Sequence, residues 1–247
     1  MRVAIMQPTY LPWSGYFDLM DQADCFVLLD DVQFSRQSWQ QRNRILGPQG
    51  GHWLTVPVRR AGTPQRILEV EIETTTPWRR KHRDAILQGY AGAPGMEVLR
   101  DFIEQSYARD WRYLVDLNLH FIRALRDHLG ITTPLRRASE LEVEHPAGRS
   151  DRLVELCRAL GADQYLSPAG AWEYLGTGEA LREAGIGLLY HDYTPVPYRQ
   201  RAEGFVSFLS VLDLLLNEGP SSLEVIRRGR GEPLAPEVFA AAREMTA

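Results

Sequence analysis

Short apolar runs separated by polar stretches dominate the start of the chain. Residues 3–6 form an apolar run that ends at Gln7 and Pro8, and residues 25–29 form a second run between aspartates. Apolar runs of this length, bounded by turn residues, are typical of strands buried on both faces of a parallel sheet. Residues 10–22 predict a loop followed by a short helix, so the segment as a whole predicts a strand–helix–strand unit.

The next segment has a different periodicity. Residues 67–73 alternate between apolar side chains and glutamates, which indicates a strand with one solvated face. Residues 53–58 are also strand-like, although Pro57 restricts them to a sheet edge or to the end of a strand. Since residues 61–64 supply a turn, the pattern predicts an antiparallel hairpin over residues 52–73, attached to the sheet or to its rim.

Residues 76–130 carry the three- and four-residue spacing of helices. Thr76 and Pro77 supply a cap and a first-turn proline for the first of them. This segment is a candidate helical subdomain, but no linker marks its boundary, so we interpret residues 1–247 as a single α/β domain. The predicted helices cover about residues 76–88, 95–107 and 110–129.

The last third of the chain returns to alternating strands and helices. Ser150 and Gly161 are placed to begin and to end a helix, and residues 205–216 carry the apolar stripe of another. Two more short helices are predicted at the C-terminus. The alternation predicts a three-layer α/β fold with a mostly parallel sheet. The predicted strands of this part are residues 134–138, 164–166 and 186–190.

Composition and charge exclude several classes of protein. A length of 247 residues, with 44% hydrophobic and 24% charged residues, fits one large or two small globular domains. Cys25 and Cys157 are too few for a disulfide scaffold and do not form the spaced pairs of a zinc site. No stretch approaches the roughly 18 apolar residues of a membrane span, so we expect a cytoplasmic protein without membrane insertion. The formal net charge of −4 argues against a nucleic-acid partner.

The small net charge conceals an asymmetry along the chain. Residues 1–35 contain one basic and five acidic residues, whereas residues 36–83 contain ten basic and three acidic residues. Guanidinium groups bind phosphate and carboxylate through paired hydrogen bonds. The basic segment therefore predicts an anion site or a docking surface for an acidic carrier protein, and a solvated basic face is the alternative.

Polar residues follow the predicted parallel strands. Because ligands of open parallel sheets bind beyond the carboxyl ends of the strands, these residues predict a site. Asp30 and Asp31 could bind a metal, act as a base, or pair with Arg42 or Arg44. Mg²⁺ is usually held by one or two carboxylates together with phosphates, so a nucleotide with Mg²⁺ is an alternative ligand. The residues that follow the strands are Gln7, Asp30, Asp31, Ser167, His191 and Asp192.

One stretch of the chain is specific enough to suggest a family. Residues 5–17 read Ile-Met-Gln-Pro-Thr-Tyr-Leu-Pro-Trp-Ser-Gly-Tyr-Phe, and related stretches continue to about residue 226. They comprise residues 23–34, 38–45, 150–153, 160–167, 174–175, 205–206 and 209–215. Here the chain resembles the WbqC-like protein family. The resemblance implies a protein of cell-surface polysaccharide loci, O-antigen loci especially, or of specialised-metabolite clusters, and hence a transferase that decorates an amino sugar or an amino-acid-derived intermediate.

A more distant similarity concerns the fold. The spacing of Pro8, Pro12 and Gly15 between the first strand and the first helix is similar to the opening of nucleotidylyltransferase-type HUP domains. The similarity implies a Rossmann/HUP-like sheet. Those enzymes place two histidines beside the glycine to hold phosphates, whereas Ser14 and Tyr16 flank it here, so nucleotidyl transfer is only an alternative activity.

We therefore predict a group transferase of the acyl or aminoacyl type, acting on a small or carrier-bound anionic intermediate without a metal. Asp30 or Asp31 would activate an acceptor amine while an arginine neutralises developing charge. The alternatives are a non-catalytic protein that binds a nucleotide-sugar or a carrier protein, and a hydrolase based on Ser167, His191 and Asp192. The oligomeric state is open, and a homodimer is one alternative. The candidate catalytic residues are Gln7, Tyr10, Asp30 and Asp31; the candidate binding residues are Gln33, Arg36, Trp39, Arg42, Asn43, Arg44, Ser150, Arg152, Ser167 and Asp192.

Overall fold

A five-stranded parallel sheet forms the centre of the computed structural model, which describes residues 1–47, 49–146 and 148–246. Its strand order is β5-β2-β1-β6-β7, and each neighbouring pair is parallel. The order reverses between β1 and β6, which places the expected ligand site of a doubly wound sheet beyond the carboxyl ends of these two strands. The strands are β1 (Arg2–Met6), β2 (Cys25–Leu28), β5 (Leu135–Arg137), β6 (Gln164–Ser167) and β7 (Gly187–Tyr190).

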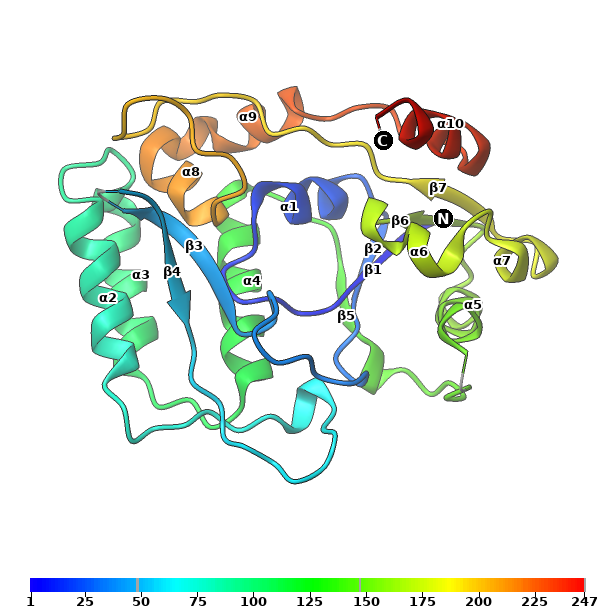
Figure 1. The fold of residues 1–247 in the computed structure, drawn as a ribbon, viewed down its shortest axis with the longest axis horizontal. Coiled ribbons are helices and arrows are strands. Elements are labelled where there is room, and N and C mark those ends of the chain that lie inside the picture. Colours follow the sequence, from blue (N-terminus) through cyan, green and yellow to red (C-terminus); the bar gives the residue numbers. More distant parts are fainter. Residues whose placement is uncertain (48, 147, 247) are drawn as a thin grey trace.

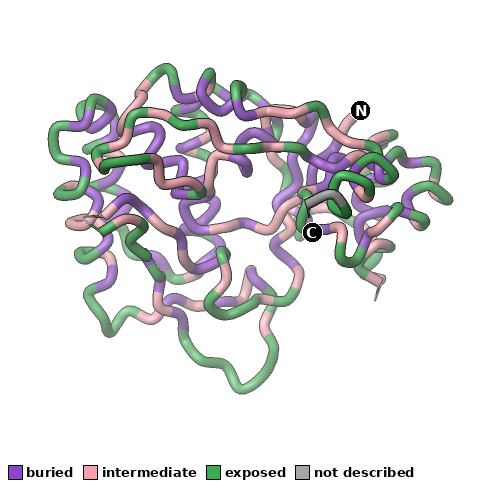
Figure 2. The backbone as a smooth tube through the Cα atoms, turned by 45° about the horizontal axis from the view of Figure 1, so that its top comes forward, coloured by how far each residue is buried: buried purple, intermediate pink, exposed green. Residues whose placement is uncertain are grey.

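Alternate residues of the central strands enter two different hydrophobic clusters. Ala4 and Phe26 belong to one cluster, and Val3 and Val27 belong to the other. Since successive side chains of a strand point to opposite faces, the sheet is buried on both sides. This confirms the predicted three-layer α/β fold, and Figure 2 shows the buried backbone inside the molecule with exposed loops at the periphery. The first cluster includes residues of α1 (Ser14–Asp21), α4 (Leu114–Leu129), α8 (Val211–Glu218) and α9 (Ser222–Arg228); the second includes residues of α5 (Arg149–Ala159), α6 (Trp172–Leu175), α7 (Glu179–Glu183) and α10 (Pro236–Thr246).

The three predicted helices of the middle segment are present as α2 (Trp78–Gly89), α3 (Met96–Ala108) and α4. Pro77 is the N-terminal cap of α2, one residue later than expected. Figure 1 shows α2 and α3 at the end of the molecule away from the sheet, with α4 between them and the sheet. One hydrophobic cluster extends from the sheet to these helices, so we propose that residues 76–130 are part of a single domain. Within the described chain, no helix is both long and apolar enough to cross a membrane.

An antiparallel hairpin exists outside the parallel sheet, but its predicted position over residues 52–73 was wrong. It consists of β3 (Arg42–Gly47) and β4 (Gly50–Thr55). Residues Ile67–Glu69 form a 3₁₀ helix, and only an isolated bridge joins Val58 to Ile72. The first strand escaped prediction because its inward residue Asn43 is polar and binds the carbonyl of Leu11 instead of packing as an apolar side chain.

Two helix starts also differ from the prediction. The helix α5 begins at Arg149 after Gly148, so Ser150 lies inside its first turn rather than capping it. The helix α8 begins only at Val211, where the hydroxyl of Ser210 accepts a hydrogen bond from the backbone N–H of Leu212 at 3.2 Å. Residues 205–209 are therefore not helical, which leaves their apolar side chains free to pack elsewhere.

Candidate functional site

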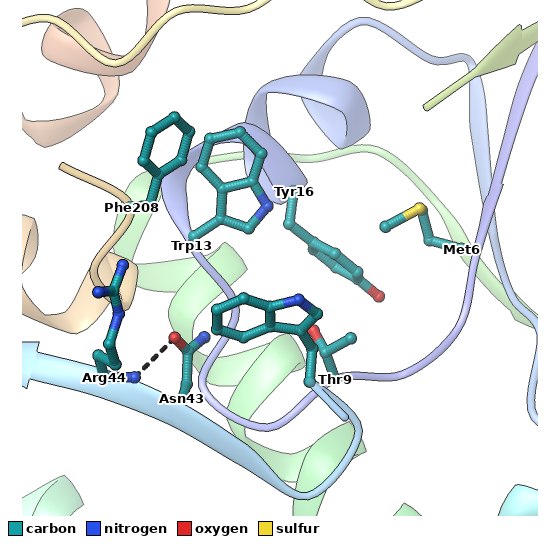
Figure 3. A pocket seen from close by; sticks show the side chains of 8 residues that line it. Met6, Thr9, Trp13, Tyr16, Asn43, Arg44 and Phe208 are labelled. Atoms are coloured by element: carbon teal, nitrogen blue, oxygen red, sulfur yellow. Dashed lines mark hydrogen bonds between the residues drawn. The ribbon is translucent and has the colours of Figure 1, made fainter. Parts of the chain in front are cut away.

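A pocket of about 460 Å³ lies beyond the carboxyl end of β1, beside the point where the strand order reverses. Figure 3 shows the rings of Trp13 and Phe208 side by side on one wall, with Tyr16 next to them. Arg44, from β3, lies at the opposite side from Met6, the last residue of β1. Aromatic walls with a few polar groups are typical of small-molecule sites. The lining residues are Met6, Thr9, Trp13, Tyr16, Trp39, Asn43, Arg44 and Phe208.

Two buried asparagines hold the segments that line the pocket. The side-chain amide of Asn118, in α4, donates to the carbonyls of Pro8 at 3.1 Å and Gln40 at 2.7 Å. Asn43 donates to the carbonyl of Leu11 at 2.7 Å. Asn118 thus connects the loop after β1 to the segment before β3, and Asn43 connects that loop to β3 itself. These two amides fix the relative position of two pocket walls.

The backbone around the pocket is strained. In the described part of the chain, three non-glycine residues have positive φ: Leu11 at 45°, Gln37 at 57° and Phe208 at 57°. All three lie in or next to the segments that line the pocket. Bulky residues rarely adopt this conformation, and such strain, of order 1–3 kcal/mol per residue, concentrates at functional sites.

The guanidinium group of Arg44 lines the pocket without a charge partner. Its Nε is buried and makes no hydrogen bond, and its Cζ lies 5.6 Å from the ring centroid of Trp53. The Cζ of Arg42 lies 4.4 Å from the same ring. A Cβ atom at Gly51 would lie 3.2 Å from Cδ of Arg44, so the glycine leaves room for this side chain. Among the described residues, no carboxylate forms an ion pair with either arginine.

Other arginines of the predicted basic segment are neutralised on the surface. Four of them pair with nearby carboxylates, so part of the charge asymmetry in the sequence is cancelled locally. The pairs are Arg59 with Glu71 at 2.9 Å, Arg66 with Glu69 at 2.6 Å, Arg79 with Asp110 at 2.6 Å and Arg83 with Asp84 at 2.8 Å.

Asp30 is fully buried at the end of β2 and does not line the pocket. Its carboxylate accepts from Nε of Arg137 at 2.7 Å, from the backbone N–H of Ser139 at 3.0 Å and from the Ser139 hydroxyl at 2.8 Å. The hypothesis that Asp30 pairs with Arg42 or Arg44 was therefore wrong about the partner. One donor from the last residue of β5 and two from Ser139 just after it make this carboxylate a link between two strand ends.

Asp31 is also buried and paired, with Arg152 of α5. One Oδ of Asp31 lies 2.5 Å from Nη2 of Arg152, whose Nη1 donates to the carbonyl of Glu144 at 2.7 Å. The other Oδ of Asp31 and Nε of Arg152 are buried without partners. Nδ1 of His145 lies 3.8 Å from the carboxylate. Arg152, predicted to bind an anionic ligand, is therefore bound to an anion of the protein itself.

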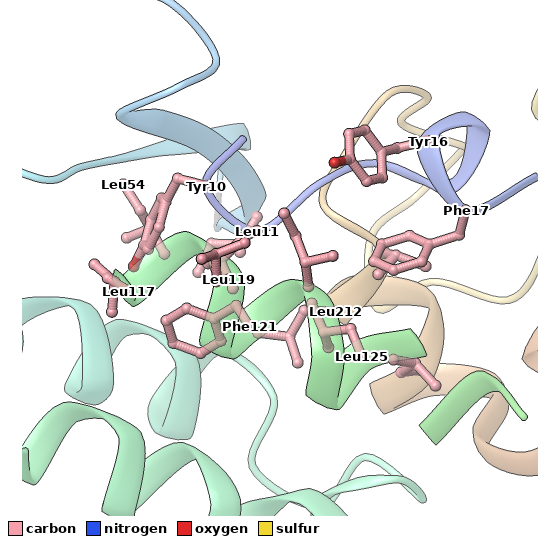
Figure 4. Packing of buried hydrophobic residues seen from close by; sticks show 14 of the residues in the cluster. Tyr10, Leu11, Tyr16, Phe17, Leu54, Leu117, Leu119, Phe121, Leu125 and Leu212 are labelled. Carbon is pink, nitrogen blue, oxygen red and sulfur yellow. The ribbon is translucent and has the colours of Figure 1, made fainter. Parts of the chain in front are cut away.

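Tyr10 lies in the core over α4, as Figure 4 shows, and not in the pocket. Its hydroxyl lies 3.0 Å from Nδ1 of His82 and 2.5 Å from the hydroxyl of Tyr107. His82 also bonds to the backbone of Thr55, so the Tyr10 hydroxyl joins a network with His82 and Tyr107. Burial raises the pKa of Tyr10 and lowers that of His82 to about 3. The neutral network anchors the loop after β1.

Gln7 connects this loop to the next one. Its side-chain oxygen accepts from the amide of Gln40 at 2.7 Å, and its backbone carbonyl accepts from the hydroxyl of Tyr16 at 3.4 Å. Tyr16 lines the pocket, so Gln7 borders the site through this contact. Gln33 and Arg36 are exposed and do not line the pocket.

The groups behind the hydrolase hypothesis are engaged elsewhere. Nε2 of His191 lies 2.7 Å from a carboxylate oxygen of Asp18, whose other oxygen accepts from Nε of Arg230 at 2.8 Å. The buried Ser167 hydroxyl donates to the carbonyl of Pro168 at 3.3 Å. Asp192 is exposed and is not the partner of His191. The arrangement is a buried ion-pair network between α1 and the C-terminal segment.

Sequence reasoning found part of the pocket and missed the rest. Trp39, Asn43 and Arg44 were predicted binding residues and lie together in it. Trp13 and Tyr16 were missed as site residues, although they stand in the most specific stretch of the sequence. Among the lining residues are no Asp, Glu, His or Cys, and the described residues contain no cluster of three such side chains that could hold a metal ion. The donor set therefore suits an anionic ligand.

Comparison with known proteins identifies one family. The WbqC-like protein family matches residues 7–225, a span that includes every pocket-lining residue except Met6. The uncharacterized protein Rv1507c of Mycobacterium tuberculosis is 34% identical over 229 residues, which cover 92% of this chain and 97% of that protein. No solved structure matches the chain.

Proposed function

The chain belongs to the WbqC-like protein family, and from this premise we propose that it is a biosynthetic group transferase. Membership of this family suggests a protein of a biosynthesis locus, here one for surface polysaccharide or specialised metabolites. The proposed substrate is a small or carrier-bound anionic intermediate. The observation that carries the proposal is the aromatic pocket at the end of β1, where Arg44 has a buried Nε without a partner.

The lining of the pocket favours transfer from an activated donor. An acyl or aminoacyl thioester needs no metal: an acceptor amine attacks the thioester carbonyl, the C–N bond forms, the C–S bond breaks, and the thiol leaves with the amine proton. Such a reaction is accelerated by holding the two reactants together and by stabilising developing negative charge. The rings would hold the apolar part of the donor, and Arg44 would supply the positive charge.

The proposal is tested by the release of thiol. The full chain is incubated with coenzyme A-linked or carrier-linked aminoacyl thioesters and with amino-sugar acceptors, and free thiol and amide product are measured. We expect Arg44→Ala and Trp39→Ala to lower turnover about tenfold or more, because each removes a contact with bound donor. Arg80→Ala, which changes an exposed arginine away from the pocket, should leave turnover unchanged. Equal rates in all three variants would contradict the assignment.

A second candidate is a protein that binds the intermediate without transforming it. The observation in its favour is that the described residues which line the pocket include no carboxylate, histidine or cysteine. The predicted general bases Asp30 and Asp31 are both held by arginines. Mass spectrometry of small molecules retained by the purified chain separates the candidates. Retention that depends on Arg44, with no thiol release, favours the binding protein. Activity that is abolished by EDTA would instead favour nucleotidyl transfer.

A further inference from the structure

Two guanidinium groups, those of Arg42 and Arg44, lie beside the pocket. Arg42 and Arg44 stand at alternate positions of β3, so their side chains leave the same face of the strand about 7 Å apart. Their cross-strand neighbour on that face is Trp53, which pairs with Arg44 in the hairpin register. In the part of the chain that the structure describes, neither guanidinium group has an ion pair. A single carboxylate would use one of them, whereas two adjacent anionic groups would use both.

The two guanidinium groups are held in place before any ligand arrives. Both lie against the ring of Trp53, at 4.4 Å for Arg42 and 5.6 Å for Arg44. The missing side chain at Gly51 leaves the space that Arg44 fills. The backbone N–H of Arg44 donates to the side-chain oxygen of Asn43 at 2.7 Å. An arginine fixed in this way, with no ion pair among the described residues, is prepared for an anion.

The remaining walls suit a flat ring. Phe208 is 50% exposed in spite of its size, and its ring centroid lies 5.3 Å from that of Trp13. Trp39 is 49% exposed, and its centroid lies 5.5 Å from that of Trp53. Exposed aromatic side chains at a pocket mouth provide the faces on which planar rings stack. The strained backbone at Phe208 shows that the fold maintains this ring position at a cost.

From these observations we infer that the pocket binds a nucleoside diphosphate moiety, with the base among the aromatic rings and the two phosphates on Arg44 and Arg42. This inference rests on the proposed function and names its ligand more closely. The moiety occurs both in nucleotide-sugars and in coenzyme A thioesters, which share its chemistry. Because the lining contains no Asp or Glu in the part of the chain that the structure describes, the arginines take the place of Mg²⁺ and binding is independent of divalent metal.

Calorimetric titration of the full chain tests the ligand class. The ligands are ADP, UDP and GDP, the matching monophosphates and nucleosides, and inorganic pyrophosphate. At least one diphosphate should bind about tenfold more tightly than its monophosphate, and more tightly than pyrophosphate, with and without EDTA. The same titration with UDP-sugars and with acetyl coenzyme A then distinguishes the two sources of the moiety.

Variants assign the two phosphates. Arg44→Ala should weaken both the monophosphate and the diphosphate about 10–100-fold, since it lines the pocket. Arg42→Ala should weaken only the binding of the diphosphate, so that it binds no more tightly than the monophosphate. Gly51→Ala should weaken binding with Arg44 still present, because the added Cβ meets its side chain, and thermal melting checks that this variant is folded. Arg80→Ala is the charge-matched control and should bind normally.

The outcomes separate this inference from the proposed function. If acyl thioesters of simple pantetheine bind in a manner that depends on Arg44 and Trp39 while nucleoside diphosphates do not, the inference is overturned and the transferase proposal stands. If the monophosphate binds as tightly as the diphosphate, the role of Arg42 is overturned. If neither class of ligand binds the full chain, the inference and the proposed site both fail.

Discussion

Charged side chains lie beyond the ends of two neighbouring strands, β2 and β1, and they differ in how they are neutralised. At the end of β2, Asp30 and Asp31 are buried and each is paired with an arginine from another element. At the end of β1, Arg44 lines a pocket with a buried Nε that has no partner. A buried charge is costly unless it is paired, so the paired set stabilises the fold and the unpaired group is available to a ligand. The comparison predicts that removing Asp30 or Asp31 lowers stability, whereas removing Arg44 lowers ligand binding.

The largest effect is expected at the deepest ion pair. Asp31→Asn leaves Arg152 buried without a counter-charge, and we expect a loss of about 3–5 kcal/mol in the free energy of unfolding. Denaturant titration measures this loss. Removing both partners together, as Asp31→Asn with Arg152→Met, should restore a large part of it, since no unpaired charge then remains. A fully stable Asp31→Asn protein with lost turnover would instead support the catalytic role predicted from the sequence.

Asp30→Asn should have a smaller effect, of about 2–3 kcal/mol. The charge-assisted bonds to Arg137 and Ser139 are weakened, but Arg137 is 24% exposed and can be solvated. Chemical denaturation followed by circular dichroism measures the change, with Asp192→Asn as the control for an exposed aspartate after another strand. If Asp30→Asn is as stable as the control, the Asp30 carboxylate does not stabilise the fold, and the proposed difference between the two strand ends no longer holds for Asp30.

The fold could be predicted from the sequence where burial is periodic. Apolar runs at residues 3–6 and 25–29 identified β1 and β2, because strands buried on both faces have no polar alternation. A hairpin is present as predicted, but it lies at β3 and β4 and not over residues 52–73, because polar alternation in residues 67–73 does not mark a strand there. In residues 67–73, Glu69 pairs with Arg66 next to a 3₁₀ turn, and Glu71 pairs with Arg59 and Arg112.

The site could be predicted only as far as residue types reveal it. Arg44, Trp39 and Asn43 were found because basic and aromatic residues cluster in their segment. Phe208 was missed, since an apolar residue three before Val211 fits the stripe of a helix that in fact begins later. Which charges are paired depends on contacts such as that of Asp31 with Arg152, which are 121 residues apart in the chain. Sequence spacing does not contain this information.

A third prediction concerns the anchor of the pocket loop and depends on pH. The pKa of His82 falls from 6.5 to about 3 on folding because the ring is buried. The unfolded chain therefore takes up a proton first as the pH falls, and the stability supplied by neutral His82 is present above about pH 6.5 and lost progressively toward pH 3. We expect a loss of about 2 kcal/mol by pH 5 from this group.

Comparison with His82→Gln isolates this contribution, because carboxylates also titrate in the same range. The variant should be less stable at pH 7, but its stability should decline less steeply between pH 6.5 and pH 4.5. Thermal unfolding at several pH values gives both slopes. Parallel pH profiles for the two proteins would show that His82 is not buried neutral, and the neutral network of Tyr10 and His82 would then not anchor the loop after β1.

The smallest effect on stability is expected at the group that matters most for binding. Arg44→Met keeps the long side chain over Gly51 and against Trp53 but removes the buried Nε, which makes no hydrogen bond. Because no partner is left unsatisfied, the free energy of unfolding should stay the same or rise by up to about 1 kcal/mol, while binding of anionic ligands is lost. Functional sites commonly contain groups that lower the stability of the fold but are needed for activity. Measuring unfolding and ligand titration on the same preparation checks both halves of the prediction. A loss of more than about 2 kcal/mol would make Arg44 a structural residue like Arg137 and Arg152, and the difference between the two strand ends would disappear.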